Sequence, residues 1–489
     1  MTEAAKPLGP RPHVGIGTKI FYGLGSVAFG IKDNGYRVFL LLFYNQVVGM
    51  DPRAVGLAIT LALIIDCVID PILGEVSDNW RSRWGRRHPF MYASALPIAL
   101  SFLLLWNPPA GWSEQALFWY LVAVAVLGRS FITMYEVPSS SLAAELTEDY
   151  DQRASILGWR YFFAWWGGLT LTVVMFWVFM AKHGQLSPIP YHLYGYVGAV
   201  LMFVSIIASA AGTHRFIPWL RQPVAGKRTL GQTLSQMKET LSNRPFVVIT
   251  LVGLVAAIAQ GVSFTLAFYF STYFWELNPF WTGVLVLDSY FSSAIALVAA
   301  PMLSKRSGKK KAGTILLAAS VLTGFLPLML RLLGWFPENA DTYGEIPAIV
   351  PWLFLDGVVR GIFGITAAIL ITAMLADVVE HSEVKTGRRS EGLFFAFTSL
   401  VQKAVGGVGV MAASFLLVLI NFPRNAKPGQ VDAEIISNMA LVYMPLLALL
   451  YGTALAIMQL YNISRETHEE NLRIIAAKAQ AAEAADVVP

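Results

Sequence analysis

The chain has 489 residues, of which 56% are hydrophobic and only 14% charged, and its mean hydropathy is +0.57. Soluble domains carry about 25% charged residues, so this composition excludes an ordinary soluble protein. The net charge of +5 does not indicate a nucleic-acid partner, because the basic residues gather in the loops between apolar segments. The single cysteine, Cys67, excludes an intrachain disulfide.

Apolar stretches follow one another along the whole chain, and most reach the roughly 20 residues that a membrane-spanning helix needs. In chain order they cover residues 18–46, 54–78, 89–107, 115–145, 154–181, 191–213, 245–275, 281–304, 313–334, 348–377, 391–421 and 437–462. The pattern predicts an all-α membrane protein with a bundle of twelve transmembrane helices.

A repeated basic loop divides these spans into two sets of six. The sequence RWGRR at 83–87 follows the second span, and RSGKK at 306–310 follows the eighth. We therefore predict four regions, which are a six-helix half at 1–213, a cytoplasmic linker at 214–244, a second half at 245–462 and a cytoplasmic tail at 463–489. Parallel repeats of this kind place a substrate site between the halves near the membrane midplane.

The loops differ in charge from one side of the predicted bundle to the other. Most basic loop residues fall on one side, and the other side carries only Arg53, Lys182, Arg424 and Lys427. The positive-inside rule then places both termini in the cytoplasm of a multi-pass protein of the cell membrane, either inner or plasma membrane. The first span is too long for the apolar region of a signal peptide, so we expect no cleaved leader.

The second span contains an acidic pair. Asp66 and Asp70 interrupt the apolar run LAITLALIIDCVIDPILGEVSD and lie on one helix face, because residues i and i+4 overlap. An aspartate at the bilayer centre costs about 2.5 to 3.5 kcal/mol even on insertion scales, so its default interpretation is functional. We interpret the pair as a site that couples a cation to transport.

Several motifs together resemble one family. The pattern D-x-x-x-D-P-I-x-G at 66–74, followed by R-S-R-W-G-R-R-x-P at 81–89, resembles the signature of the glycoside, pentoside and hexuronide cation symporters. That family is the branch of the major facilitator superfamily typified by the melibiose permease. The Lys-Asp pair at 32–33 and the stretches at 135–163 and 376–403 are also similar to it. The family fold is a bundle of twelve helices in two halves.

The resemblance implies roles for individual residues. Cation coupling would fall to Asp66, Asp70 and Thr133, with a proton or sodium as the coupling ion and no other cofactor. The residues implied to bind the substrate are Lys32, Asp33, Glu136, Arg160 and Lys403. The implied activity is sugar or glycoside uptake by alternating access, and the implied partners are the sugar, the cation and the bilayer, with the chain a monomer. Charge-assisted hydrogen bonds suit sugar hydroxyls, since they are about twice as strong as neutral ones.

The chain departs from the permease pattern at several positions. Ile69 replaces an expected Asn, which removes an oxygen ligand and favours a proton over sodium. Ser140 and Ala368 stand where the permease has aromatic residues, so the substrate is expected to differ. An anionic sugar derivative and an amphipathic lipid both stay open as alternatives. Extra charges within the spans are Arg37, Arg129, Asp288, Asp356 and Arg360.

Other charged residues have structural interpretations. Asp356 and Arg360 are one turn apart and favour a local ion pair, whereas Arg129 is equally consistent with a counter-ion and with a substrate contact. The residues expected to gate the cytoplasmic side are Asp78, Arg81, Arg87, Arg388 and Arg389. The seven histidines form no metal-binding or catalytic pattern, so the sequence predicts neither a metal site nor an enzyme.

Overall fold

The computed structural model describes residues 12–147, 150–220, 244–386 and 407–463, together with short pieces of the tail between 466 and 477. Within these ranges the chain is almost entirely helical, which confirms the predicted all-α class. The exception is a two-stranded hairpin of β1 (Thr342–Tyr343) and β2 (Ile346–Pro347), which the hydropathy pattern did not predict.

The amino-terminal helices follow one another with short connections. They are α1 (Ile16–Leu24), α2 (Val27–Asn34), η1 (Gly35–Phe39), α3 (Leu40–Leu42), η2 (Phe43–Val47), α4 (Pro52–Asn79), α5 (His88–Leu105), α6 (Glu114–Leu146), α7 (Tyr150–Val174), η3 (Met175–Met180), α8 (Ala181–His183), α9 (Pro188–His214) and η4 (Ile217–Trp219). The later elements are α11 (Arg244–Tyr269), η5 (Phe270–Phe274), α12 (Pro279–Val286), α13 (Asp288–Ser307), α14 (Lys309–Leu332), α15 (Ile349–Thr386), a helix at Gly407–Leu419 and α17 (Ala433–Gln459).

Helix starts follow local sequence signals. The Asp51 carboxylate accepts a hydrogen bond from the backbone N–H of Arg53 at 2.8 Å and caps α4, which has a proline at its first turn. Ser113 caps α6 in the same way, through the backbone N–H of Ala116 at 3.3 Å. Such caps satisfy backbone donors that have no partner within the helix.

Ten of the helices in the described ranges are long and apolar enough to cross a membrane. The first predicted span, 18–46, is a separate case because it is not one regular helix. It breaks between α1 and α2 and then contains two π-helical turns, η1 and η2. Turns of this kind occur frequently at functional sites. Here η1 directly follows the charged residues Lys32 and Asp33.

Contacts group the chain into two compact units. Unit 1 contains residues 1–226 together with 261–283 and 410–432, and unit 2 contains 227–260, 284–409 and 433–489. The predicted boundaries of the two halves, linker and tail stay predictions.

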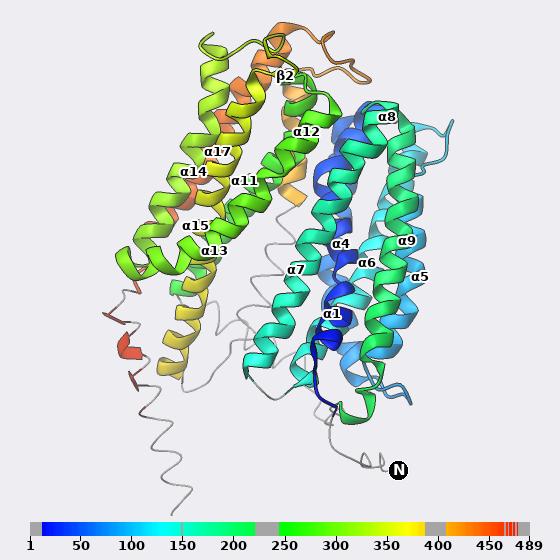
Figure 1. Ribbon diagram of the computed structural model, residues 1–489, viewed down its shortest axis with the longest axis vertical. Helices are drawn as coiled ribbons and strands as arrows, with labels where there is room; N and C mark the ends of the chain where they lie inside the picture. Colours follow the sequence, from blue (N-terminus) through cyan, green and yellow to red (C-terminus); the bar gives the residue numbers. More distant parts are fainter. Residues whose placement is uncertain are drawn as a thin grey trace, which may run out of the picture. The chain divides into compact units, whose positions relative to one another are not determined.

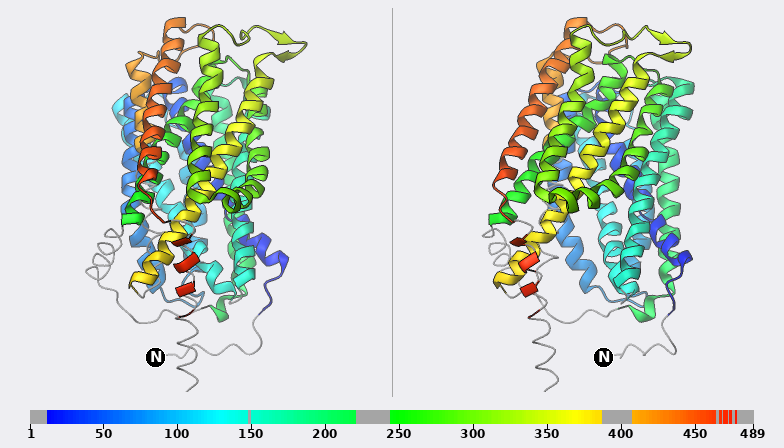
Figure 2. Two further views of the ribbon diagram at one scale, coloured as in Figure 1. Left: turned by 90° about the vertical axis from the view of Figure 1, so that its left-hand side faces the viewer. Right: turned by 60° about the vertical axis from the view of Figure 1, so that its left-hand side comes forward.

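Within unit 1 the helices form a bundle of long neighbours (Figure 1). Helix α4 packs along α6, α5 packs against both α6 and α9, and α1 and α2 pack against α7. Within unit 2, α15 packs against both α13 and α14, and α14 also contacts α17. Figure 2 shows these long helices running alongside one another. A buried apolar cluster in unit 2 joins α11 to α15 and α17 through side chains that include Phe246, Met374 and Met458.

The contact between α2 and α7 depends on two glycines. A Cβ added at Gly30 would overlap the backbone carbonyl of Ala164, and one added at Gly168 would overlap the backbone of Gly30. The two helices therefore approach backbone to backbone. This close approach holds the helix that carries Lys32 and Asp33 against α7.

We predict that Gly168→Val forces α2 away from α7. Overpacking of this kind typically lowers the free energy of unfolding by about 1 to 3 kcal/mol. The matched control is Gly158→Ala on the same helix, where an added Cβ meets nothing within 4 Å. The control should be at least as stable as the parent, since alanine favours a helix over glycine by about 1 kcal/mol. Thermal unfolding in detergent measures both, and equal melting temperatures would contradict the close approach.

Candidate functional site

The acidic pair of α4 faces an arginine on α6. Asp66 is only 4% exposed. Its Oδ2 accepts a hydrogen bond from Nε of Arg129 at 3.1 Å and lies 3.0 Å from Nη2 of the same guanidinium, within ion-pair distance. Arg129 is itself 7% exposed. The sequence left Arg129 open between two roles, and the structure places it as the counter-ion of Asp66.

Thr133 joins the two carboxylates. It lies one helical turn after Arg129 on α6, and its Oγ is 2.6 Å from Oδ1 of Asp70 and 3.3 Å from Oδ1 of Asp66. A threonine hydroxyl has a single hydrogen to donate, and the shorter distance favours Asp70 as the acceptor. Asp66, Asp70 and Thr133 are thus brought together as one cluster, with Arg129 as its fourth member.

Tyr36 of η1 covers the other side of this cluster. The guanidinium carbon of Arg129 lies 5.6 Å from the centre of the Tyr36 ring, a cation–π arrangement. Tyr36 also lines a small cavity with Lys32, Ser101 and Gly128. The irregular first span therefore contacts the α4–α6 cluster.

A second polar cluster joins α1, α6 and α7. Nη2 of Arg160 lies 2.5 Å from Oε1 of Glu136, and Nη1 donates to Ser139 Oγ at 2.9 Å and to the Tyr22 hydroxyl oxygen at 3.3 Å. Within the described part of the chain, Oε2 of Glu136 is buried and has no hydrogen-bond partner. A buried acceptor of this kind fits a hydroxyl donor from a ligand.

The charges of α2 and η1 form a third group. Asp33 Oδ2 lies 3.1 Å from Nε of Arg37, and Asp33 Oδ1 lies 3.9 Å from Nζ of Lys32. The Arg37 side chain is 51% exposed, whereas that of Lys32 is 10% exposed. Arg37 was noted in the sequence as an extra charge, and its position four residues after Asp33 is the signal that could have predicted their pairing.

Several predicted substrate-binding and gating residues lie wholly or partly outside the described part of the chain. Lys403, Arg388 and Arg389 lie outside the described residues. Asp78 lies in the last turns of α4, but its side chain is outside the described part, and Arg81 is exposed in the following loop. Their roles in substrate binding and gating stay predictions.

Arg87 contacts an acid within its own unit. Its Nε and Nη2 both lie 3.3 Å from Oε1 of Glu145 at the end of α6, which Arg86 also contacts. Unit 2 repeats the arrangement, because Lys309 at the start of α14 lies 2.5 Å from Asp377 of α15. The sequence repeat predicted the basic residues but missed both acids, although A-E-L-T-E at 144–148 matches A-D-V-V-E at 376–380.

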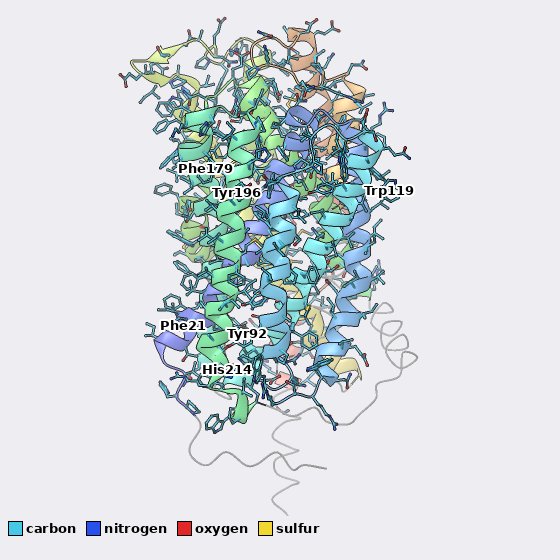
Figure 3. The ribbon with its side chains drawn as sticks, turned by 90° about the vertical axis from the view of Figure 1, so that its right-hand side faces the viewer. Phe21, Tyr92, Trp119, Phe179, Tyr196 and His214 are labelled. Carbon is cyan, nitrogen blue, oxygen red and sulfur yellow. The ribbon has the colours of Figure 1, made fainter. Side chains whose placement is uncertain are left out.

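Two histidines near the Arg87–Glu145 end of unit 1 contact hydroxyl groups of neighbouring side chains. The Tyr92 hydroxyl lies 3.2 Å from Nδ1 of His214, and Figure 3 shows these two side chains close together near the lower end of α5 and α9. His88 lies 3.1 Å from the Thr213 hydroxyl. Among the residues that the structure describes, no three His, Cys, Asp or Glu side chains group as a metal site.

The opposite end of unit 1 holds a hydrogen-bonded cluster that sequence reasoning missed. Nε2 of Gln46 donates to the carbonyl of Pro423 at 3.1 Å and to Oδ1 of Asn45 at 2.6 Å. Its Oε1 accepts from the backbone N–H of Ala426 at 2.9 Å, and the Tyr269 hydroxyl donates to Asn45 Oδ1 at 2.8 Å. The amide of Gln46 thus joins η2 to the segment around 423–426. Asn45, also in η2, joins η2 to Tyr269 at the end of α11. We call this group the Gln46 cluster.

An ion triad lies beside the Gln46 cluster. Arg424 reaches Oδ2 of Asp51 at 2.6 Å and Oε2 of Glu114 at 3.3 Å. These side chains are one-third to one-half exposed, and pairs of such exposure contribute only about 0 to 1 kcal/mol each. The buried amide contacts are therefore the stronger link at this end of the unit.

In unit 2 the extra charges also lie together. Nε of Arg360 is 3.8 Å from Oδ2 of Asp356, which confirms the predicted local pair. The carboxylate of Asp288 on α13 packs against Gly357 of α15, the residue after Asp356, so close that a Cβ on that glycine would overlap it.

Comparison with known proteins identifies the family. The family described as MFS/sugar transport protein matches residues 21–465. An uncharacterised symporter of Synechocystis is 25% identical, with 95% of this chain and 97% of that protein covered. A putative glycoside/cation symporter of Escherichia coli is 24% identical (91% and 92% covered), and the isoprimeverose transporter of Lactiplantibacillus pentosus is 23% identical (91% and 88%).

Solved structures show the same fold. A nucleoside transporter aligns with a TM-score of 0.61 at 13% identity, covering 92% of this chain and 99% of that structure. The family match confirms the family that the motifs at 66–74 and 81–89 resemble. The chain belongs to the sugar-transport family of the major facilitator superfamily, and it is a multi-pass membrane transporter rather than an enzyme.

Proposed function

We propose that this transporter takes up a sugar or glycoside together with a proton, by alternating access. The observation that carries the proposal is the arrangement on α6. Arg129 and Thr133 contact the two carboxylates of α4, and Glu136, three residues after Thr133, contacts Arg160. Residues three apart are neighbours on a helix face, so the proposed cation and sugar sites share one turn of α6.

The second cluster has the chemistry of a sugar site. Arg160 offers a forked donor and Glu136 retains a buried acceptor oxygen, and both suit vicinal hydroxyls. Asp33, Lys32 and Lys403 complete the proposed substrate residues. The relatives named for a glycoside and for isoprimeverose support a sugar as the substrate class.

An anionic sugar derivative is the second candidate. The half-exposed Arg37 beside Asp33 gives the first span a guanidinium within reach of a charged ligand. A forked guanidinium binds a carboxylate through two hydrogen bonds. Thermal stabilisation by methyl glucuronide but not by methyl xyloside or lactose would favour the anionic class.

The membrane orientation is also proposed. The positive-inside rule places both termini and the Arg87–Glu145 end of unit 1 in the cytoplasm. The Gln46 cluster then lies at the outer face. We propose that the protein functions as a monomer in the cell membrane.

We predict that Asp70→Asn abolishes proton-driven accumulation. An amide retains the shape of the side chain and accepts a hydrogen bond from Thr133, but it cannot bind and release a proton. The measurement is uptake into proteoliposomes of isoprimeverose, methyl xyloside, methyl glucuronide and lactose, with an imposed proton gradient. Exchange without a gradient should survive in the variant. Wild-type accumulation by Asp70→Asn would contradict the role of this carboxylate.

A separate prediction concerns the outer face. Gln46→Ala removes the amide that joins η2 to residues 423–426, and buried partners left without hydrogen bonds cost about 1 to 3 kcal/mol. The variant should therefore populate an outward-open state. Labelling of Phe422→Cys from outside the cell, in a Cys67→Ser background, should become several-fold faster.

The matched control for this test is Asn107→Ala. Asn107 lies at the same end of unit 1, but its amide donates to the carbonyl of Leu103 in its own helix turn at 2.8 Å. Labelling of Phe422→Cys should stay slow in this control. Equal labelling rates in Gln46→Ala and Asn107→Ala would show that the Gln46 cluster does not close the outer face.

A further inference from the structure

We infer that Arg129 acts as a tethered cation, which occupies at Asp66 the place that a sodium ion would otherwise take. The inference rests on the proposed cation coupling and specifies its ion. Arg129 thereby excludes sodium from the site. Asp70 is then the member of the acidic pair that binds and releases a proton.

The guanidinium of Arg129 already sits at the carboxylate of Asp66. Oδ2 accepts a hydrogen bond from Nε of Arg129 and lies 3.0 Å from its Nη2, and Oδ1 lies 3.3 Å from the Thr133 hydroxyl. Oδ2 of Asp66 is thus paired with Arg129, and Oδ1 lies beside the Thr133 hydroxyl, whose single hydrogen is donated to Asp70. The guanidinium supplies one positive charge, the same charge that a monovalent coupling ion would supply.

Arg129 is also fixed in this position. It is buried, packs under the ring of Tyr36 and binds Asp66 through two nitrogens of its planar fork. The planar guanidinium fork is pre-organised, so less rotamer entropy is lost for each hydrogen bond than with a lysine. A guanidinium does not lose its proton in a protein, so its charge is permanent.

Sodium and a proton differ in what they require at this site. A hard cation needs several oxygen ligands, and Ile69 provides only an apolar side chain between the two aspartates. A bound sodium would also lie beside the permanent charge of Arg129. A proton needs one carboxylate oxygen, and the partly buried Asp70 offers it with Thr133 as a hydrogen-bond partner.

The test measures sodium binding by purified protein without any sugar. Melting temperatures in detergent are compared between sodium chloride and choline chloride at equal ionic strength. We expect no sodium-specific shift in the wild type or in Arg129→Lys, which retains the charge. We expect Arg129→Gln to gain a shift of about 1 to 3 °C when sodium is about tenfold above its dissociation constant.

The double variant Asp66→Asn/Arg129→Gln is the matched control. It removes the carboxylate together with the guanidinium, so the new sodium response should disappear. A folded Arg129→Gln protein without a sodium-specific shift would overturn the inference. If Arg129→Gln does not fold, the inference is tested on the wild type. A sodium-specific shift in the wild-type melting temperature that Asp66→Asn removes would also overturn the inference.

The result is independent of the proposed transport activity. A sodium response in Arg129→Gln supports the tethered cation even if none of the sugars tested for uptake is accumulated. Proton-driven uptake together with a sodium-binding wild type would retain the proposed function and reject only the role of Arg129.

Discussion

The buried pair of Asp66 and Arg129 constrains the α4–α6 interface of unit 1, because a charge in an apolar span must find its partner inside the protein. At 3 Å and an effective dielectric constant of about 20, the attraction is about 5 kcal/mol. That gain is comparable with the several kcal/mol needed to desolvate each ion. Removing one partner alone typically destabilises by about 3 to 5 kcal/mol. Helices α4 and α6 are therefore held in register, with Thr133 fixed opposite Asp70.

Other polar contacts of unit 1 join the neighbouring helices to α6 and to one another. Arg160 joins α7 to α6 through Glu136 and Ser139, and to α1 through Tyr22. The glycine contact between α2 and α7 brings the first span into the same bundle. At one end Arg87 connects the loop after α4 to the end of α6, and at the other end Gln46 connects η2 to residues 423–426. The Arg87 end is thus joined by buried ion pairs, whereas the other end is joined by buried amide hydrogen bonds beside a more exposed ion triad.

Much of this could be predicted from the sequence, since hydropathy alone reveals most spans and a buried aspartate pair has few structural explanations. The partners of charged residues were harder to predict. Arg129 is 63 positions from Asp66, and only the packing of α4 on α6 shows which acid it contacts. The break in the first span has no strong sequence signal, because Gly25 and Ser26 are both tolerated in membrane helices. The Gln46 cluster joins segments more than 370 positions apart through backbone carbonyls and N–H groups, which no side-chain motif encodes.

The proposed mechanism carries a proton across the membrane together with the sugar through the α4–α6 cluster. Its most direct test is to record the pH of a lightly buffered, sodium-free suspension of cells expressing the protein while isoprimeverose, methyl xyloside, methyl glucuronide or lactose is added. A transported sugar should raise the external pH in wild-type cells and leave it unchanged in Asp70→Asn cells. Entry of the same sugar without any change of pH, or only when sodium is present, would contradict the account.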